Sequence, residues 1–157
     1  MEIAAIILAA GEGARLNSAL PKPLHHVGGR PMLAWSLDAA RAAAANRVLT
    51  VLPKESDSII KWLDGQESCI QDFPKGTGHA VKAAKDKLAD FQGVALVMFA
   101  DTPLVTAKTL VSLADAVADG SDIAVLAFEA NNPKGYGRLV IGADQCLERI
   151  VEQTDAT

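Results

Sequence analysis

A continuous apolar segment at residues 3–10 (IAAIILAA) runs into a loop that contains Gly11 and Gly13. The segment is too short to cross a bilayer. Its lack of polar alternation is typical of a parallel strand that is covered on both faces. Glycine has no Cβ, so such a loop can take positive φ angles and approach a bound group closely. The feature predicts a central strand of an α/β sheet with a ligand-binding loop beyond its carboxyl end.

The rest of the chain alternates between apolar runs and segments with helical spacing. The expected strands cover residues 47–52, 68–73, 94–100 and 122–128, and the expected helices cover residues 31–45, 56–64, 79–88 and 106–118. Pro31 suits the first position of a helix, and Thr106 suits an N-cap. This alternation indicates an α/β fold with a three-layer, doubly wound and mostly parallel sheet. A hairpin is expected at residues 137–141 and 146–152, and residues 1–157 are expected to form one domain.

Composition limits the classes of partner. The formal net charge is −4, which argues against general binding to nucleic acid or to an anionic membrane surface. It leaves room for one phosphorylated small molecule, which needs only a few local cations. Cys69 and Cys146 lie far apart, and Glu2 precedes the first apolar run where a secretory signal would be basic. We therefore expect a cytoplasmic protein with reduced thiols, and the spacing of its histidines and cysteines does not predict zinc.

Two cations follow the glycine loop. Arg15 offers a planar fork of donors and Lys22 a compact charge, and both suit phosphate oxygens. Pro21 and Pro23 flank Lys22 and restrict its backbone. The loop is not a Walker loop, since no Gly-Lys-Ser/Thr follows, and Leu16 stands where a dinucleotide fingerprint needs its third glycine. A nucleotide triphosphate loop is our interpretation, and a plain strand–turn with incidental basic residues is the alternative.

Three further groups of residues carry chemistry. Asp101 follows the most apolar of the later strands, where a carboxylate could bind Mg²⁺; alternatively it caps a turn before Pro103. Gln71 and the Gly-Thr-Gly stretch at residues 76–78 could read a pyrimidine edge, or they could be an exposed glutamine and a helix start. Residues 135–138 (GYGR) and Glu152 could hold sugar hydroxyls, or they could be a loop and a solvated acid.

Taken together, these stretches carry a resemblance. Residues 8–15 (LAAGEGAR), 20–22 (LPK), 71, 76–80 (GTGHA), 100–104 (ADTPL), 135–138 (GYGR), 150–152 (IVE) and 155–157 (DAT) occur in one order. In this order and spacing the chain resembles the uridylyltransferase domain of the bacterial bifunctional N-acetylglucosamine-1-phosphate uridylyltransferases/glucosamine-1-phosphate acetyltransferases of cell-wall (peptidoglycan) precursor synthesis. These proteins are a branch of the MobA-like NTP transferase superfamily, which has a Rossmann-like nucleotidyltransferase fold. The resemblance covers essentially the whole chain.

The resemblance implies a role for each candidate residue. Arg15 and Lys22 would be the catalytic residues, contacting the triphosphate and stabilising the departing pyrophosphate. The nucleotide would be bound by Leu8, Ala10, Gly11, Gly13, Lys22, Gln71, Gly76 and Thr77, with uracil held by Gln71 and Gly76. Asp101 would bind Mg²⁺, and Gly137 and Glu152 would hold N-acetylglucosamine. The implied reaction transfers UMP from UTP to N-acetylglucosamine-1-phosphate.

The chain also departs from the family pattern. Ala14 stands where the family usually has Thr, and Pro23 replaces a usual aliphatic residue. Family members continue beyond the position of Thr157, so we expect a domain that is truncated at its C-terminus, without the second protein ligand for Mg²⁺. A monomer or weak oligomer is expected. The alternatives are a non-catalytic relative that binds a nucleotide or nucleotide sugar, and a nucleotidyltransferase for another sugar phosphate or base.

Overall fold

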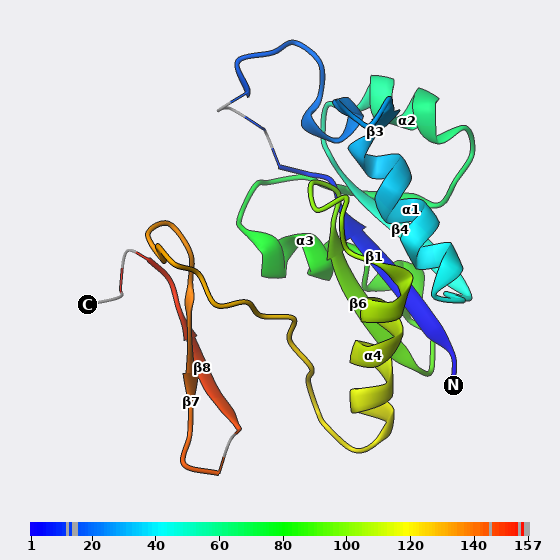
Figure 1. Cartoon of the computed structure of the whole chain (residues 1–157). Coiled ribbons are helices and arrows are strands. Elements are labelled where there is room, and N and C mark those ends of the chain that lie inside the picture. Colours follow the sequence, from blue (N-terminus) through cyan, green and yellow to red (C-terminus); the bar gives the residue numbers. More distant parts are fainter. Residues whose placement is uncertain (12, 14–15, 145, 154, 156–157) are drawn as a thin grey trace. The chain divides into compact units, whose positions relative to one another are not determined.

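A parallel sheet of four strands forms the centre of the computed structural model, which describes residues 1–11, 13, 16–144, 146–153 and 155. The strand order is β5 (Ser68–Gln71), β4 (Arg47–Pro53), β1 (Ile3–Leu8) and β6 (Val94–Phe99). All three neighbouring pairs are parallel. Figure 1 shows β1 as a central strand between β4 and β6. The chain divides into two compact units, residues 1–124 and 125–157, and the sheet belongs to the first.

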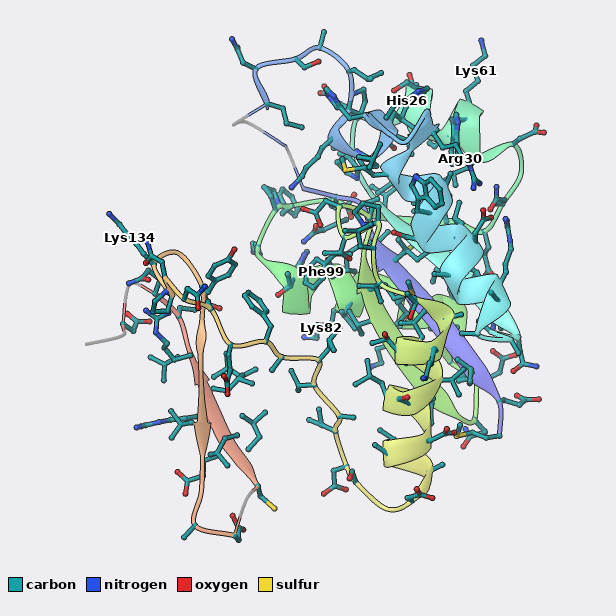
Figure 2. All side chains as sticks on the ribbon, viewed as in Figure 1. His26, Arg30, Lys61, Lys82, Phe99 and Lys134 are labelled. Atoms are coloured by element: carbon teal, nitrogen blue, oxygen red, sulfur yellow. The ribbon has the colours of Figure 1, made fainter. Side chains whose placement is uncertain are left out.

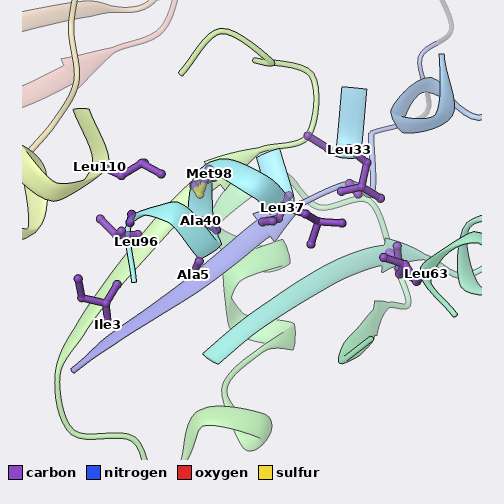
Figure 3. Close-up of a cluster of buried hydrophobic side chains, with 14 of the residues drawn as sticks. Ile3, Ala5, Leu33, Leu37, Ala40, Leu63, Leu96, Met98 and Leu110 are labelled. Atoms are coloured by element: carbon purple, nitrogen blue, oxygen red, sulfur yellow. The ribbon is translucent and has the colours of Figure 1, made fainter. Parts of the chain in front are cut away.

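Helices cover both faces of the sheet. Leu37 of α1 (Met32–Ala42), Ile59 of α2 (Asp57–Leu63) and Leu110 of α4 (Ala107–Ala118) pack in one cluster with Ile7 of β1. Figure 3 shows this core between the sheet and its helices. Ala80 of α3 (Thr77–Ala83) packs with the other face of β1 and β4. The three-layer, doubly wound α/β sheet expected from the sequence is therefore confirmed.

The first strand is apolar throughout because both of its faces are covered. All six residues of β1 are buried, with alternate side chains entering the two opposite clusters. Burying one large aliphatic side chain stabilises a fold by about 1.5–3 kcal/mol. β1 and β4 supply several such side chains, among them Ile7, Leu49 and Leu52. This burial fixes the strand ends that carry the candidate site.

The helices differ from their predicted bounds in small ways. Pro31 is the N-cap of α1, with φ −53° and ψ 141°, and not its first helical residue. The predicted helix 79–88 is split into α3 and a short 3₁₀ turn at Asp86–Leu88. The predicted N-cap at Thr106 is confirmed, because its side chain accepts a hydrogen bond from the backbone N–H of Thr109 at 3.3 Å.

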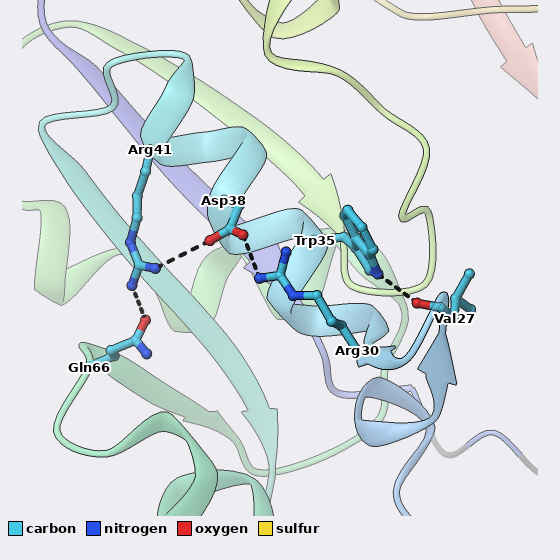
Figure 4. Close-up of polar contacts among 6 residues, drawn as sticks. All are labelled: Val27, Arg30, Trp35, Asp38, Arg41 and Gln66. Carbon is cyan, nitrogen blue, oxygen red and sulfur yellow. Dashed lines mark hydrogen bonds and ion pairs between the residues drawn. The ribbon is translucent and has the colours of Figure 1, made fainter.

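A small hairpin that the sequence analysis did not predict leads into α1. β2 (His26–Val27) and β3 (Arg30–Pro31) are antiparallel, and both turn glycines between them have positive φ, as a two-residue hairpin loop of this type requires. Figure 4 shows how α1 holds the hairpin. Trp35 Nε1 donates to the Val27 carbonyl at 2.9 Å, and the Arg30 guanidinium lies 4.7 Å from the Trp35 ring.

The predicted strand at 122–128 is wrong. No ladder joins these residues to another described strand, and Ile123, Val125, Leu126 and Phe128 are exposed. An apolar run becomes a strand only where a neighbour supplies hydrogen bonds and cover, and this segment has neither among the described residues. No helix in the described part of the chain is long and apolar enough to cross a membrane.

The unit of residues 125–157 contains the predicted hairpin. β7 (Arg138–Ile141) and β8 (Leu147–Val151) pair in antiparallel fashion, which confirms the prediction. Arg138 lies opposite Val151 in the ladder. Phe128 and Tyr136 contact each other edge to face, with ring centroids 5.0 Å apart.

Candidate active site

A cavity of about 260 Å³ lies at the carboxyl ends of the strands of the first unit. The sheet order reverses at β1, since the chain moves from β1 outward to β4 and β5 on one side and then returns to β6 on the other side. Ligands of such sheets bind at this point of reversal. Residues 8–11, 22–23, 71, 74, 76–77, 80 and 99–101 line the cavity, and Phe99 is labelled in Figure 2.

The backbone directly after β1 still bonds to the neighbouring strands before it leaves the sheet. Ala9 N–H donates to the Val51 carbonyl at 2.9 Å, and Ala100 N–H donates to the Leu8 carbonyl at 3.0 Å. These are the last ladder contacts before the two loops diverge. Gly11 has no positive φ, so its predicted conformational role is not used. Gly11 lines the cavity, and a Cβ there would meet no atom within 4 Å.

Lys22 lies on a constrained segment, as predicted from its two prolines. It begins a 3₁₀ turn at Lys22–Leu24 whose N-cap is Pro21, and Leu24 N–H donates to the Pro21 carbonyl at 2.9 Å. Gly13 packs directly on this turn. Its φ is +63°, and a Cβ there would lie 2.8 Å from the Lys22 Cβ. Glycine is therefore required at position 13 both for its φ angle and for the close approach of the lysine.

Asp101 is held by a tight turn at the end of β6. The Phe99 carbonyl accepts hydrogen bonds from Ser36 Oγ at 3.2 Å and from Thr102 Oγ1 at 3.0 Å. This arrangement directs the Asp101 carboxylate to the cavity, where Oδ2 forms an ion pair with Lys22 Nζ. The side chains of Lys22 and Asp101 are 27% and 36% exposed. The carboxylate is thus engaged by the lysine and does not simply cap the turn before Pro103.

Gln71 is buried, so the alternative of an exposed glutamine is excluded. It ends β5, and its side chain lines the cavity while Nε2 donates to the Gly76 carbonyl at 3.2 Å. The same nitrogen lies 3.1 Å from His79 Nδ1. Gly76 is the N-cap of α3, and Thr77 is its first residue. The sequence analysis did not assign a role to His79, whose spacing of eight residues from Gln71 has no recognisable pattern.

Arg15, Gly137 and Glu152 are the remaining predicted site residues. Arg15 falls outside the described residues. Gly137 and Glu152 belong to the second unit, where they directly precede β7 and follow β8 next to the terminal pair of Arg138 and Val151. Gln153, which the sequence analysis missed, accepts hydrogen bonds there from Gly135 N–H at 2.7 Å and from Arg138 Nη2 at 3.3 Å.

The donor set at the cavity fits a hard cation that is shared with a ligand. Asp101 is the one carboxylate among the described residues that line the cavity. In the described part of the chain, no three His, Cys, Asp or Glu side chains gather closely enough to hold a metal by themselves. Mg²⁺ suits such a site because it commonly takes one or two carboxylates, with phosphate oxygens and waters completing its shell.

Comparison with known proteins gives relatives over nearly the whole chain. "Bifunctional protein GlmU" of Caulobacter vibrioides is 46% identical over 157 residues, and that of Trichlorobacter lovleyi is 44% identical over 158 residues. Each match covers 98% of this chain but 34% of the relative. The chain therefore spans about a third of the length of these relatives.

Solved structures share the fold. A putative glucose-1-phosphate thymidylyltransferase from Bacillus anthracis, in complex with a sucrose, has a TM-score of 0.77 and 18% identity, over 96% of this chain and 64% of its own. Rv0371c from Mycobacterium tuberculosis has a TM-score of 0.64 and 24% identity, over 75% of this chain and 61% of its own. A second structure of Rv0371c, with manganese, has a TM-score of 0.57 and 22% identity, over 76% of this chain and 61% of its own.

A family model matches nearly the whole chain. The model of the MobA-like NTP transferase domain matches residues 5–156, a range that includes all four strands of the sheet except the first two residues of β1. The chain belongs to the MobA-like NTP transferase family.

Proposed function

We propose that this chain transfers UMP from UTP to N-acetylglucosamine-1-phosphate, giving UDP-N-acetylglucosamine and pyrophosphate. The observation that carries the proposal is the meeting of Lys22 and Asp101 at one cavity, which the loop after β1 and Gln71 also line. The identity of 42–46% to proteins named GlmU supports the choice of reaction. In this proposal residues 1–157 act as one nucleotidyltransferase domain.

The proposed reaction needs positioning and charge neutralisation more than a protein nucleophile. An oxygen of the sugar 1-phosphate attacks the α-phosphorus of UTP, and the bond to the bridging oxygen breaks as pyrophosphate leaves. Lys22 would contact the β- and γ-phosphates and offset the charge that develops on the leaving group. Arg15 would share this role. Backbone around Ala10, Gly11 and Gly13 would line the path of the nucleotide.

Asp101 would hold Mg²⁺ together with the phosphate oxygens. When bound, the metal would neutralise phosphate charge and align the attacking and leaving oxygens. Asp101 would have to exchange its contact with Lys22 for this role. The exchange is inexpensive, because an ion pair as exposed as this one contributes about 0–1 kcal/mol. Lys22 would then be released toward the triphosphate.

The base and the sugar have separate candidate groups. Gln71 and Gly76 would hold uracil, with Leu8 and Thr77 beside the nucleoside. Gly137 and Glu152 would hold N-acetylglucosamine through backbone and carboxylate contacts. The support for the sugar pair is that both residues flank the terminal pair of the β7–β8 hairpin, Arg138 and Val151.

The proposed reaction requires few partners. The proposal needs two small-molecule substrates and Mg²⁺, with no nucleic acid and no membrane as partner. Cys69 and Cys146 are both free thiols, as the cytoplasm permits. We propose a cytoplasmic monomer or weak oligomer.

The test is release of pyrophosphate from UTP and N-acetylglucosamine-1-phosphate, measured with Mg²⁺ and with EDTA. We expect release that depends on both substrates and on the metal, and that falls at least tenfold in Lys22→Met. Glu67→Gln is the control, because it breaks an ion pair of similar exposure that does not line the cavity. UTP binding without release would favour a non-catalytic nucleotide-binding protein. Release with another sugar phosphate or base alone would keep the enzyme class and change the substrate.

A further inference from the structure

The amide of Gln71 is held from two sides. Nε2 lies 3.2 Å from the Gly76 carbonyl oxygen and 3.1 Å from His79 Nδ1. Gln71 ends β5, whereas Gly76 and His79 belong to the start of α3, the short helix labelled in Figure 1. Because Gln71 is 6% exposed, its amide has little freedom to exchange these partners for water.

The carbonyl of Gly76 determines which way the amide faces. A carbonyl oxygen only accepts hydrogen bonds, so the amide atom that faces it must be the nitrogen. One hydrogen of that nitrogen points to Gly76, and the second points to His79. His79 Nδ1 must therefore accept, and the proton of the neutral ring lies on Nε2.

The oxygen of the same amide remains available to a ligand. Gln71 Oε1 accepts no hydrogen bond from a described residue. Among the described residues, the side-chain polar atoms that are both fully buried and without a hydrogen-bond partner are Thr50 Oγ1 and Ser56 Oγ, so Gln71 Oε1 is not one of them. Since Gln71 lines the cavity, Oε1 is the part of the amide that a bound base can reach.

We propose that His79 is a positioning residue that fixes the Gln71 amide and thereby selects a base with a ring N–H. This inference rests on the proposed use of UTP. Both donor hydrogens of Gln71 are engaged by Gly76 and His79, so the cavity receives an acceptor from this side chain. Uracil presents N3–H to such an acceptor. Cytosine has nearly the same size but presents an unprotonated N3, which places two acceptors against each other.

Two substitutions at position 79 separate this role from simple packing. His79→Leu places an apolar side chain of similar bulk there but removes the acceptor, so the second hydrogen of Gln71 Nε2 loses its partner and becomes available to the base while the first stays on Gly76. His79→Asn can place its Oδ1 near the position of Nδ1 and should keep the amide fixed. His26→Asn is the control, because His26 is exposed on the β2–β3 hairpin (Figure 2).

The measurement is the ratio of the dissociation constants of CTP and UTP, obtained by titration calorimetry with Mg²⁺. We expect wild type to prefer UTP. His79→Leu should reduce this preference about fivefold or more, the scale on which one hydrogen bond contributes, whereas His79→Asn and His26→Asn should keep it. Equal weakening of both nucleotides in His79→Leu, with the ratio unchanged, would assign His79 a purely structural role and overturn the inference. Failure of wild type to bind UTP would overturn the proposed function itself.

A second measurement needs no ligand and is made on the wild-type protein. Long-range ¹H–¹⁵N correlation spectra of the wild-type protein, recorded at a pH where the ring is neutral, report which nitrogen carries the proton. We expect the His79 ring to carry it on Nε2, with His79→Asn used to assign the signals. A proton on Nδ1 would mean that this nitrogen donates, which is incompatible with the arrangement around Gln71.

Discussion

Replacing Lys22 by methionine removes one charge from the candidate site while keeping most of the side chain's length. The stem must be kept because the Lys22 Cβ packs over Gly13, where there is no room for even one more carbon. Methionine preserves this contact, so the variant tests the ammonium and not the packing of the turn. We predict a small loss of stability and a large loss of affinity for a nucleoside triphosphate.

The effect on stability follows from the exposure of the ion pair. The Lys22 and Asp101 side chains are 27% and 36% exposed, and pairs with this access to solvent contribute about 0–1 kcal/mol. For a chain of this size, 1 kcal/mol corresponds to about 2–4 °C in Tm. The unfolding temperature of Lys22→Met should therefore fall by no more than about 4 °C.

The effect on binding is larger because a triphosphate offers several anionic oxygens. A hydrogen bond to a charged group contributes about 1.5–3 kcal/mol. Lys22 must weaken its contact with Asp101 to make this bond, which subtracts up to about 1 kcal/mol. The net loss of about 0.5–3 kcal/mol is centred on a weakening of UTP binding of about tenfold.

Calorimetric titration with UTP and with UMP distinguishes the possible contacts. If Lys22 binds the β- and γ-phosphates, Lys22→Met weakens UTP and leaves UMP nearly unchanged. Glu67→Gln, which breaks the Arg47–Glu67 pair with side chains 30% and 35% exposed, should match the loss in Tm but retain UTP affinity. An unchanged dissociation constant for UTP in Lys22→Met would refute the reasoning and leave the lysine a structural role only.

Two further predictions concern the same unit, and a third compares the thiols of the two units. Gly13→Ala should weaken UTP binding at least as much as Lys22→Met, because the new Cβ displaces the lysine and the alanine must adopt a φ of +63°. Calorimetry checks this, and wild-type affinity would contradict it. Asp101→Asn should weaken UTP binding about tenfold in Mg²⁺ but not in EDTA, where removing a negative charge favours the triphosphate; equal weakening in both buffers would exclude a metal role. At pH 8 a thiol reagent should label Cys146 before Cys69, because Cys146 is exposed and burial raises the pKa of the Cys69 thiol, with the nearby Lys87 charge only partly opposing this; absorbance with and without Cys146→Ser identifies the fast thiol.

The regular elements of the first unit were predictable because their signals are local. An apolar run such as residues 3–10 identifies a strand buried on both faces without knowledge of its neighbours. The N-cap at Thr106 likewise depends on a few adjacent residues. The strand predicted at 122–128 failed because its signal was equally apolar but its formation depends on a partner strand. The Gly28–Gly29 hairpin was missed although two adjacent glycines are a recognised turn signal.

The candidate site was predictable residue by residue but not as a set of contacts. Lys22 and Asp101 were singled out for their chemistry, yet their pairing joins positions 79 residues apart. The role of His79 depends on the orientation of one amide, which no spacing in the sequence encodes. Arg15 stays a prediction, since it falls outside the described residues.

The register of the sheet explains why these distant residues meet. Leu8 lies opposite Phe99 at the ends of β1 and β6. Two residues further along each strand, Ala10 is therefore level with Asp101. On the other side Leu8 lies opposite Val51, so Ala10 is level with Pro53, which pairs with Gln71. One row across four strands thus runs from Gln71 to Asp101, whose backbones are separated by three strand spacings or about 14 Å. A slip of one residue in any of the three ladders would turn the side chains of that strand to the opposite face. The buried core that fixes the register therefore also sets how far Gln71, proposed to read the base, lies from Lys22 and Asp101, proposed to hold the phosphates.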